Sequence, residues 1–408
     1  MSYKNSMGVP IEMQSNQLAK LPRQTWDSPP WNRWSFQHVG AFLETAAVEH
    51  GRSLAEPALA LQQIPNALVS VELDLPHIGK CDLDTFLDET YTDGFLVMHK
   101  GLLKHESYFG FLDASKLHLS QSMAKSVTAA TLGILVEQGL IDLEEQVTHY
   151  LPELKQTAYV GATIQHLLDM ASGVKYSEVY VDANSDVALT EIASGWRQAP
   201  EGVRAPENIW QQILGLKTLE APHGSRWLYR SIETDVLAFC MEKVTAKRLP
   251  QIVSELIWQR IGAEEDASFT IDSSGYGIAD GGFNASLRDY ARFGLLYLNE
   301  GRNLKGEQVV PASWVAATQT ADHELFAKTG SLGLPDGGYK NQFWIEDSAQ
   351  GAMMCVGIYG QLIYINPVQE LLVVKLSTWP SALNPEFKID TLSAIHQIAD
   401  HLNLGNAL

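Results

Sequence analysis

Ser122 and Lys125 lie three residues apart at the start of a run of small and apolar residues that ends at Gly139. In a helix this spacing puts both side chains on one face, one turn apart, with an ammonium beside a hydroxyl. The first turn also offers free N–H groups and the positive end of the helix dipole, which favour a developing negative charge. The pattern therefore suits a nucleophilic serine that must lose its proton, although a serine at a helix start is more commonly only a cap.

The chain contains the same pattern a second time, at Ser172 and Lys175. Gly173 lies inside this copy, and together with its setting it predicts a loop. A loop does not fix a lysine one turn above a serine. The sequence therefore favours Ser122 as the nucleophile.

The elements that must hold Ser122 are predicted on both sides of it. Residues 95–98 and the segment around residues 107–109 have the pattern of two strands of a hairpin, with Gly101 in the turn. Residues 127–138 are apolar on most sides, which predicts a buried helix that Gly139 ends. Two strands followed by a buried helix would hold a reactive serine rigidly.

The remaining chain predicts an α/β (α+β) fold, an antiparallel sheet flanked by helices, built from both ends of the sequence. Residues 1–140 and 265–408 would form this sheet domain, with residues 1–35 as an irregular surface arm, and residues 141–264 a mostly helical inserted domain. Strand signals return at residue 269, and residues 362–365 and 371–376 predict a second buried hairpin. The predicted helices are residues 36–63, 83–92, 163–170, 225–244, 250–261, 285–299 and 389–404.

Composition excludes several classes of function. The 408 residues carry 48 acidic and 29 basic side chains, a formal charge of −19, which argues against nucleic acid or an anionic membrane as partner. No stretch approaches the roughly 18 apolar residues of a membrane span, and the N-terminus has no secretory apolar region. Three cysteines without a CxxC pair predict neither a disulfide framework nor a zinc site. We therefore expect a cytoplasmic enzyme without a metal or organic cofactor, acting on a small molecule; its oligomeric state is open, a homodimer included.

Four further segments carry polar side chains in a specific order. The segments are residues 163–173, the Tyr229 and Ser231 segment 222–231, the glycine turn and capped helix start 281–289, and residues 357–361. In this order they resemble the serine β-lactamase-like hydrolases of the class C branch, which include DD-peptidases and family VIII carboxylesterases. The most similar branch is that of the 6-aminohexanoate-dimer (nylon-oligomer) hydrolases, and the likeness extends from residues 31–34 through 89–93 and 180–182 to 374–380. The resemblance implies a β-lactamase/transpeptidase-like fold.

The resemblance also implies roles for individual residues. Ser122 would be the acylated nucleophile, Lys125 its neighbouring cation and Tyr229 the tyrosine of the Tyr-x-Ser motif. The backbone N–H groups of Ser122 and Ile358 would form the oxyanion hole. The substrate-binding residues implied in this way are Tyr180, Trp196, Ser231, Glu191, Asp280 and Tyr359. On residue type alone, the two aromatic residues Tyr180 and Trp196 could equally pack in a core, and the acids Glu191 and Asp280 could be surface or capping residues.

Two departures from the family pattern bear on the substrate. Residues 358–360 stand where β-lactamases have Lys-Thr-Gly, so the lysine that would hold a β-lactam carboxylate is missing. Residues 328–330 do spell Lys-Thr-Gly, but they lie upstream of their place in the family order, and we interpret them as coincidence. Asp280 replaces a polar amide beside the site, and Glu191 falls where the nylon hydrolases use an acid for the substrate ammonium.

We therefore predict a serine hydrolase that cleaves small carboxylic esters or linear amides through an acyl-Ser122 intermediate. Tyr229 is assigned as general base and as proton donor to the leaving group, with Lys125 as its electrostatic partner. Both groups have reference pKa values of about 10 or more, so the sequence leaves open which of them takes the serine proton first. The alternatives are a β-lactamase or DD-peptidase and, from another class, an inactive ligand-binding protein on the same fold.

Overall fold

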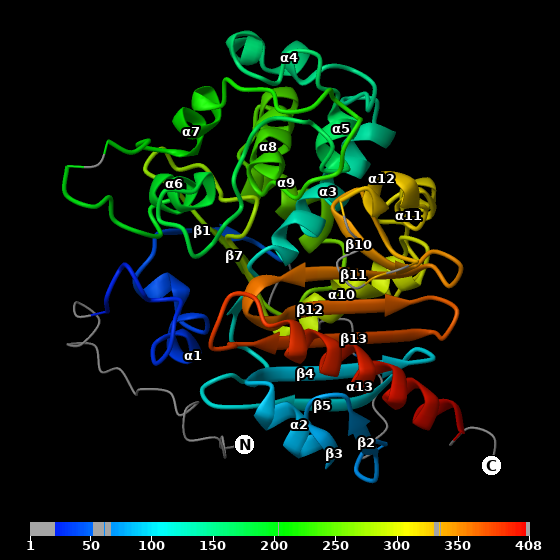
Figure 1. Cartoon of the computed structure of the whole chain (residues 1–408). Helices are drawn as coiled ribbons and strands as arrows, with labels where there is room; N and C mark the ends of the chain where they lie inside the picture. Colours follow the sequence, from blue (N-terminus) through cyan, green and yellow to red (C-terminus); the bar gives the residue numbers. More distant parts are fainter. Residues whose placement is uncertain are drawn as a thin grey trace.

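A seven-stranded antiparallel sheet unites the two ends of the chain in the computed structural model (Figure 1), which describes residues 21–51, 61, 67–202, 204–329, 334 and 336–404. The strands in spatial order are β5 (Leu102–Tyr108), β4 (Thr92–His99), β13 (Leu371–Ser377), β12 (Gln361–Asn366), β11 (Ala352–Gly357), β10 (Phe343–Asp347) and β9 (Gly338–Lys340). Each pair of neighbours is antiparallel. Both predicted hairpins are confirmed, and β13 joins them by pairing with β4.

Both faces of this sheet are buried, which the alternation of side chains along β4 shows. Leu96 and Met98 belong to one hydrophobic cluster, and Phe95 and Val97 belong to a second. Because successive side chains of a strand point to opposite faces, the two clusters lie on opposite sides of the sheet. Helix α13 (Pro385–Leu404) packs in the second cluster, whereas α10 (Leu287–Leu298) and α3 (Met123–Glu137) pack in the first.

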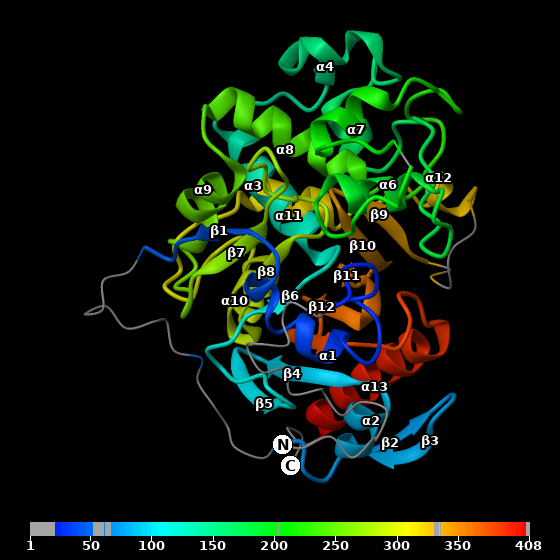
Figure 2. The same ribbon diagram turned by 90° about the vertical axis from the view of Figure 1, so that its left-hand side faces the viewer.

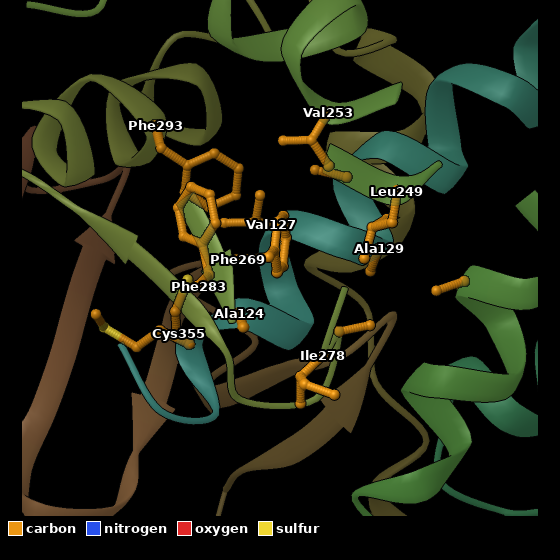
Figure 3. Packing of buried hydrophobic residues seen from close by; sticks show 14 of the residues in the cluster. Ala124, Val127, Ala129, Leu249, Val253, Phe269, Ile278, Phe283, Phe293 and Cys355 are labelled. Carbon is orange, nitrogen blue, oxygen red and sulfur yellow. The ribbon is translucent and has the colours of Figure 1, made fainter. Parts of the chain in front are cut away.

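Helix α3 is the central element of the molecule. Every residue from Met123 to Leu135 is buried, as the run of small and apolar residues predicts. Figure 3 shows Ala124, Val127 and Ala129 within a packed cluster that includes Phe269 and Phe283. This packing fixes the first turn of α3 rigidly.

A mostly helical region separates the two halves of the large sheet along the chain and covers the upper part of the molecule in Figure 1. Its helices are α4 (Val147–Tyr150), the 3-10 turn η4 (Pro152–Gln156), α5 (Ile164–Leu168), α6 (Asp186–Ala193), α7 (Ile209–Gly215), α8 (Ile232–Thr245), α9 (Leu249–Val253) and the π-helical turn η5 (Ser254–Trp258). The division into two domains at residues 140 and 265 stays a prediction.

Smaller elements complete the fold. A four-stranded sheet has the order β1 (Thr45–Val48), β7 (Ala267–Thr270), β8 (Phe283–Ala285) and β6 (His118–Leu119), and a separate hairpin consists of β2 (Glu72–Leu75) and β3 (Gly79–Asp82). The other elements are α1 (Asn32–Ser35), η3 (Val39–Ala41), α2 (Leu83–Glu89), α11 (Ala312–Thr318), α12 (His323–Ala327) and η6 (Ile358–Gly360).

Two predictions about the N-terminal part are wrong. The segment 36–63 is not a helix where it is described, because β1 lies within it and pairs with β7. The arm does not simply lie on the surface: its described part buries Trp26 completely and Trp34 to 5% exposure in the first cluster. The first 20 residues of the predicted arm lie outside the described residues.

Candidate active site

Ser122 occupies the N-terminal end of α3, and its side chain makes no capping hydrogen bond there. Instead its Oγ accepts a hydrogen bond of 2.9 Å from Lys125 Nζ. The preceding residue, Gln121, has φ = 49°, a left-handed conformation that costs energy in a residue other than glycine. This turn separates the end of β6 from the start of α3 and presents the serine hydroxyl. The capping explanation for Ser122 is therefore wrong.

Lys125 is almost completely buried, with 1% exposure, and also donates to the backbone carbonyl of Asp280 at 2.6 Å. Burial alone would lower the pKa of Lys125, but Tyr229 when it is ionised, together with Asp280 and Glu178, more than offsets this effect, so the pKa is raised. The side chain therefore holds its positive charge at neutral pH.

Tyr229 lies close to both groups. The Nζ of Lys125 is 5.2 Å from the centroid of the Tyr229 ring, which stacks on Trp344 and meets Tyr339 edge-on. Burial raises the pKa of the phenol, while the charge of Lys125 and hydrogen bonds with Ser122 and Lys125 act in the opposite direction. A hydroxyl, an ammonium and a phenol thus meet at one place, although Tyr229 precedes α8 and does not belong to the helix predicted from residue 225.

The segment around Ile358 approaches the nucleophile closely. A Cβ built on Gly357 would lie 2.4 Å from the carbonyl oxygen of Ser120, so only glycine fits here without a shift of the backbone. Ile358 then lines the same pocket as Ser122. Ser122 and Ile358, the two residues predicted for the oxyanion hole, thus lie at one pocket.

The pocket has an empty volume of about 400 Å³ and opens beside Ser122. Of the residues predicted for the site, Ser122, Ile358, Tyr180, Trp196, Ser231, Glu191 and Asp280 line it. The remaining lining residues were not predicted: Gln121, Val187, Thr190, Ser194, Ile278 and Gly281. Apolar and hydroxyl side chains on α6 and near β7 carry no motif, so no pattern in the sequence marks them.

Tyr359 does not line the pocket. Its hydroxyl donates to Asp27 Oδ2 at 3.2 Å, and its ring packs edge-on against Phe36 at 5.3 Å. Its φ of 62° is left-handed, so the backbone turns sharply directly after Ile358. The structure therefore gives no support to a substrate contact of the Tyr359 side chain.

Glu178 connects two predicted substrate-binding residues and was missed in the sequence. Its carboxylate accepts hydrogen bonds from the backbone N–H of Ser231 at 2.9 Å, from Ser231 Oγ at 2.5 Å and from Tyr180 Oη at 2.8 Å. Its position two residues before Tyr180 is the only signal that could have pointed to it. Glu178 thus fixes Tyr180 beside the start of α8.

Glu191 lines the pocket but is already paired. Arg197 Nε donates to its Oε2 at 2.5 Å, and the same guanidinium donates to Asp27 at 2.7 Å. Burial raises the pKa of Glu191 to about 7, against the opposing charge of Arg197. Asp280 is also buried, and burial raises its pKa although the charge of Lys125 opposes this shift.

The two coincidental motifs lie apart from this pocket. Ser172 is fully buried in a loop, as predicted, and donates to Glu233, whereas Lys175 is exposed. Lys328 is exposed at the end of α12, and Gly330 lies outside the described residues.

Among the residues that the structure describes, no three His, Cys, Asp or Glu side chains are grouped so that they could hold a metal ion. None of the helices there combines the length and the apolar character that a membrane crossing requires.

Comparisons with known proteins identify the family of the chain. The family model described as Beta-lactamase matches residues 87–396. The chain is 34% identical over 359 residues to the 6-aminohexanoate-dimer hydrolase of Paenarthrobacter ureafaciens, covering 87% of this chain and 88% of that protein.

Solved structures show the same relationship. A provisionally named 6-aminohexanoate-dimer hydrolase from Bacillus anthracis superposes with a TM-score of 0.84 at 30% identity, covering 97% of this chain and 99% of that one. A family VIII carboxylesterase at 15% identity, covering 77% of this chain and 95% of its own, has a TM-score of 0.56 and shares the fold. The chain belongs to the Beta-lactamase family and is a serine hydrolase.

Proposed function

We propose that the chain hydrolyses small carboxylic esters or linear amides through an acyl-enzyme on Ser122. The observation that carries this proposal is the 2.9 Å contact between Lys125 Nζ and Ser122 Oγ, beside Tyr229 and at the wall of a pocket. A serine that only capped a helix would need neither the buried lysine nor the phenol.

In the first half of the reaction, Ser122 Oγ forms a bond to the substrate carbonyl carbon. The serine proton passes to the oxygen of Tyr229, for which the phenol must first be ionised. The Lys125 ammonium stabilises the phenolate, because it lies beside the ring and keeps its own proton. Of the two candidate bases that the sequence leaves open, this geometry favours Tyr229.

Collapse of the tetrahedral intermediate completes acylation. The bond from the carbonyl carbon to the leaving oxygen or nitrogen breaks, and the leaving group takes the proton from Tyr229. The backbone N–H groups of Ser122 and Ile358 would bind the negative oxygen, each contributing about 3–4 kcal/mol. Water, activated by the same tyrosine, then attacks the acyl group and releases Ser122.

The pocket indicates the size and character of the substrate. Trp196, Val187 and Ile278 supply apolar surface, and Thr190 and Ser194 supply hydroxyls. Tyr180, which lines the pocket and donates to Glu178, would contact the leaving group, as the resemblance implies. These features support a small molecule with a short acyl chain as the partner.

We also propose that the protein works in the cytoplasm. Cys240 and Cys355 are buried free thiols and Cys81 is half-buried and free, a pattern that suits a reducing compartment. Fractionation of the source cells with an antibody against the protein tests this proposal, and recovery in an extracellular fraction would contradict it.

A hydrolysis panel tests the proposed function. Short p-nitrophenyl esters, the 6-aminohexanoate dimer, a chromogenic cephalosporin and a D-Ala-D-Ala peptide are each offered to the wild type and to Ser122→Ala. We expect turnover of the esters or of the linear amide that Ser122→Ala abolishes. Turnover of the cephalosporin or the peptide alone would instead establish the β-lactamase or DD-peptidase alternative.

A further inference from the structure

Residues 21–36, which are the described part of the N-terminal arm and the residue that follows it, contact the walls of the pocket on two sides, and we refer to them as the strap. The Beta-lactamase family match begins only at residue 87, so the strap lies outside it. In Figure 2 the segment around α1 lies in front of the end of the large sheet where β12 begins. Its position raises the question of what the strap does for the site.

On one side the strap binds the turn that follows α6. Trp26 Nε1 donates to the carbonyl of Trp196 at 3.0 Å, and the two indole rings meet edge-on at 5.6 Å. Arg23 donates to the carbonyl of Gly195 at 3.0 Å, and Gln24 to that of Gln198 at 2.7 Å. Because Trp196 lines the pocket, these bonds fix one of its walls.

On the other side the strap binds the segment that carries the oxyanion hole. Phe36 packs against the Tyr359 ring, and Asn32 Nδ2 donates to the carbonyls of Thr378 and Trp379 at 3.3 and 3.0 Å. Trp379 in turn donates its backbone N–H to the carbonyl of Tyr359 at 3.1 Å. The strap therefore touches the residue next to Ile358 both directly and through its neighbours.

Asp27 joins the two sides. It is 3% exposed, and its Oδ2 accepts from Tyr359 Oη at 3.2 Å and from Arg197 Nη2 at 2.7 Å. Arg197 continues the chain of contacts to Glu191 in the pocket wall. The buried carboxylate of Asp27 thus links Tyr359, which follows Ile358, to Glu191 in the pocket wall.

The backbone conformation explains why the oxyanion segment needs such an anchor. Tyr359 has φ = 62° and Gly360 has φ = 89°, so two consecutive residues are left-handed. A tyrosine pays about 1–3 kcal/mol for this conformation, which persists only where surrounding contacts hold it. The Ile358 N–H belongs to the peptide between Gly357 and Ile358, directly before this turn, so a displacement of the turn would carry the donor with it.

We propose that Asp27 is a positioning residue: through Tyr359 it holds the oxyanion segment in place, and through Arg197 it holds the acidic wall of the same pocket. This proposal rests on the proposed function, since it assigns a role to the segment around Ile358 in that reaction. It makes the strap a part of the active site that the rest of the family domain does not supply.

Four single variants and one double variant test the proposal. Tyr359→Phe removes only the hydroxyl that donates a hydrogen bond to Asp27. Asp27→Ala removes the hydrogen bonds with both Tyr359 and Arg197. Asp27→Asn keeps an oxygen that can accept the hydrogen bond from Tyr359. Tyr364→Phe is the matched control, because Tyr364 is also a buried tyrosine, on β12, whose hydroxyl donates to a carboxylate, Glu346, at 2.7 Å. For each protein we would measure the thermal midpoint, the rate at which a fluorophosphonate labels Ser122, and kcat and KM for a p-nitrophenyl ester.

We expect Tyr359→Phe to lower the labelling rate and kcat about 10- to 100-fold, the loss typical of an approximately 1 Å displacement in an active site, with little change in KM. Asp27→Ala should lower kcat to a similar extent and raise KM as well, because Arg197 and Glu191 lose their anchor. Asp27→Asn should restore most of kcat. In the double variant Asp27→Ala/Tyr359→Phe, kcat should fall no further than in Asp27→Ala alone, since both changes break the same contact.

Tyr364→Phe should keep the wild-type labelling rate and kcat. The proposal is overturned if Tyr359→Phe and Asp27→Ala keep the wild-type labelling rate, or if Tyr364→Phe loses as much as they do. Failure of the proposed function gives a different result, namely a wild type that the probe does not label at Ser122 at all.

Discussion

The chain contains the Ser-x-x-Lys pattern twice, and the two copies lie in different backbone structures. At Ser122 the pattern begins a buried helix, so Lys125 is held 2.9 Å from the serine hydroxyl. At Ser172 the pattern lies in a loop, where the serine donates to buried Glu233 and Lys175 is exposed to solvent. A Ser-x-x-Lys motif can therefore supply a nucleophile and its cation only where the backbone brings both side chains to one face.

The largest effect should come from removing the hydroxyl of the first copy. Ser122→Ala should lower kcat/KM for an ester by at least about 10⁴-fold, because no acyl-enzyme can form. The Lys125 ammonium keeps its bond to the Asp280 carbonyl, so the thermal midpoint should change little. Steady-state kinetics and calorimetry measure both, and substantial residual turnover by a folded variant would remove Ser122 from the mechanism.

A second prediction concerns the phenol of Tyr229, which lies beside Ser122 and Lys125. Tyr229→Phe should lower kcat by about 10²–10⁴-fold, the usual contribution of a general base. Trp344 and Tyr339 still hold the ring, so the fold should persist. If kcat stays near the wild-type value, the base is a different group.

The pH dependence of the reaction tests whether Tyr229 is the base beside Ser122. Burial raises the pKa of Tyr229, and the surrounding acids keep Lys125 charged over the same range. Because the active form of the base is the deprotonated one, kcat/KM should rise as the pH increases above neutrality. Tyr229→Phe should abolish this rise, and a profile that falls through the same range would contradict the assignment.

The second copy should matter for stability and not for rate. Ser172→Ala removes the hydroxyl that donates to Glu233, a carboxyl whose pKa burial raises to about 8. Losing that partner should lower the free energy of unfolding by about 1–3 kcal/mol. Denaturant titration measures the loss, while kcat/KM should equal that of the wild type; a kinetically dead Ser172→Ala that still folds would mean that the wrong serine was chosen.

Lys175→Ala should have the smallest effect of all. Replacing an exposed lysine away from special features changes the free energy of unfolding by no more than about 0.5 kcal/mol, and Lys175 does not line the pocket.

The matched change Lys125→Ala should instead lower kcat by about 10²–10⁴-fold, since the phenolate of Tyr229 loses its counter-charge. Equal kcat values for Lys125→Ala and Lys175→Ala would contradict the role of Lys125 beside Ser122.

The sequence predicted well what depends on local pattern. The run of small residues after Ser122 gives the buried helix α3, and alternating apolar residues give the hairpin of β4 and β5. Tyr229 could be placed beside Ser122 only through the resemblance, because 107 residues separate them and no periodicity connects them.

What the sequence did not predict depends on contacts between distant segments. Residues 45–48, Thr-Ala-Ala-Val, contain two alanines, which favour helix, yet they form β1 because β7 offers an edge to pair with. Glu178 and Asp27 carry no motif, and their importance follows only from the donors that the fold places around them. Tyr359 was predicted to contact substrate, but its left-handed φ directs its ring to the strap instead.

Labelling with a fluorophosphonate, followed by mass spectrometry of the digested protein, shows which serine is the nucleophile. We expect one phosphonyl group per chain on the peptide that contains Ser122, with the Ser172 peptide unmodified, and no label after Ser122→Ala. Label on the Ser172 peptide, or stoichiometric label that persists in Ser122→Ala, would contradict the account.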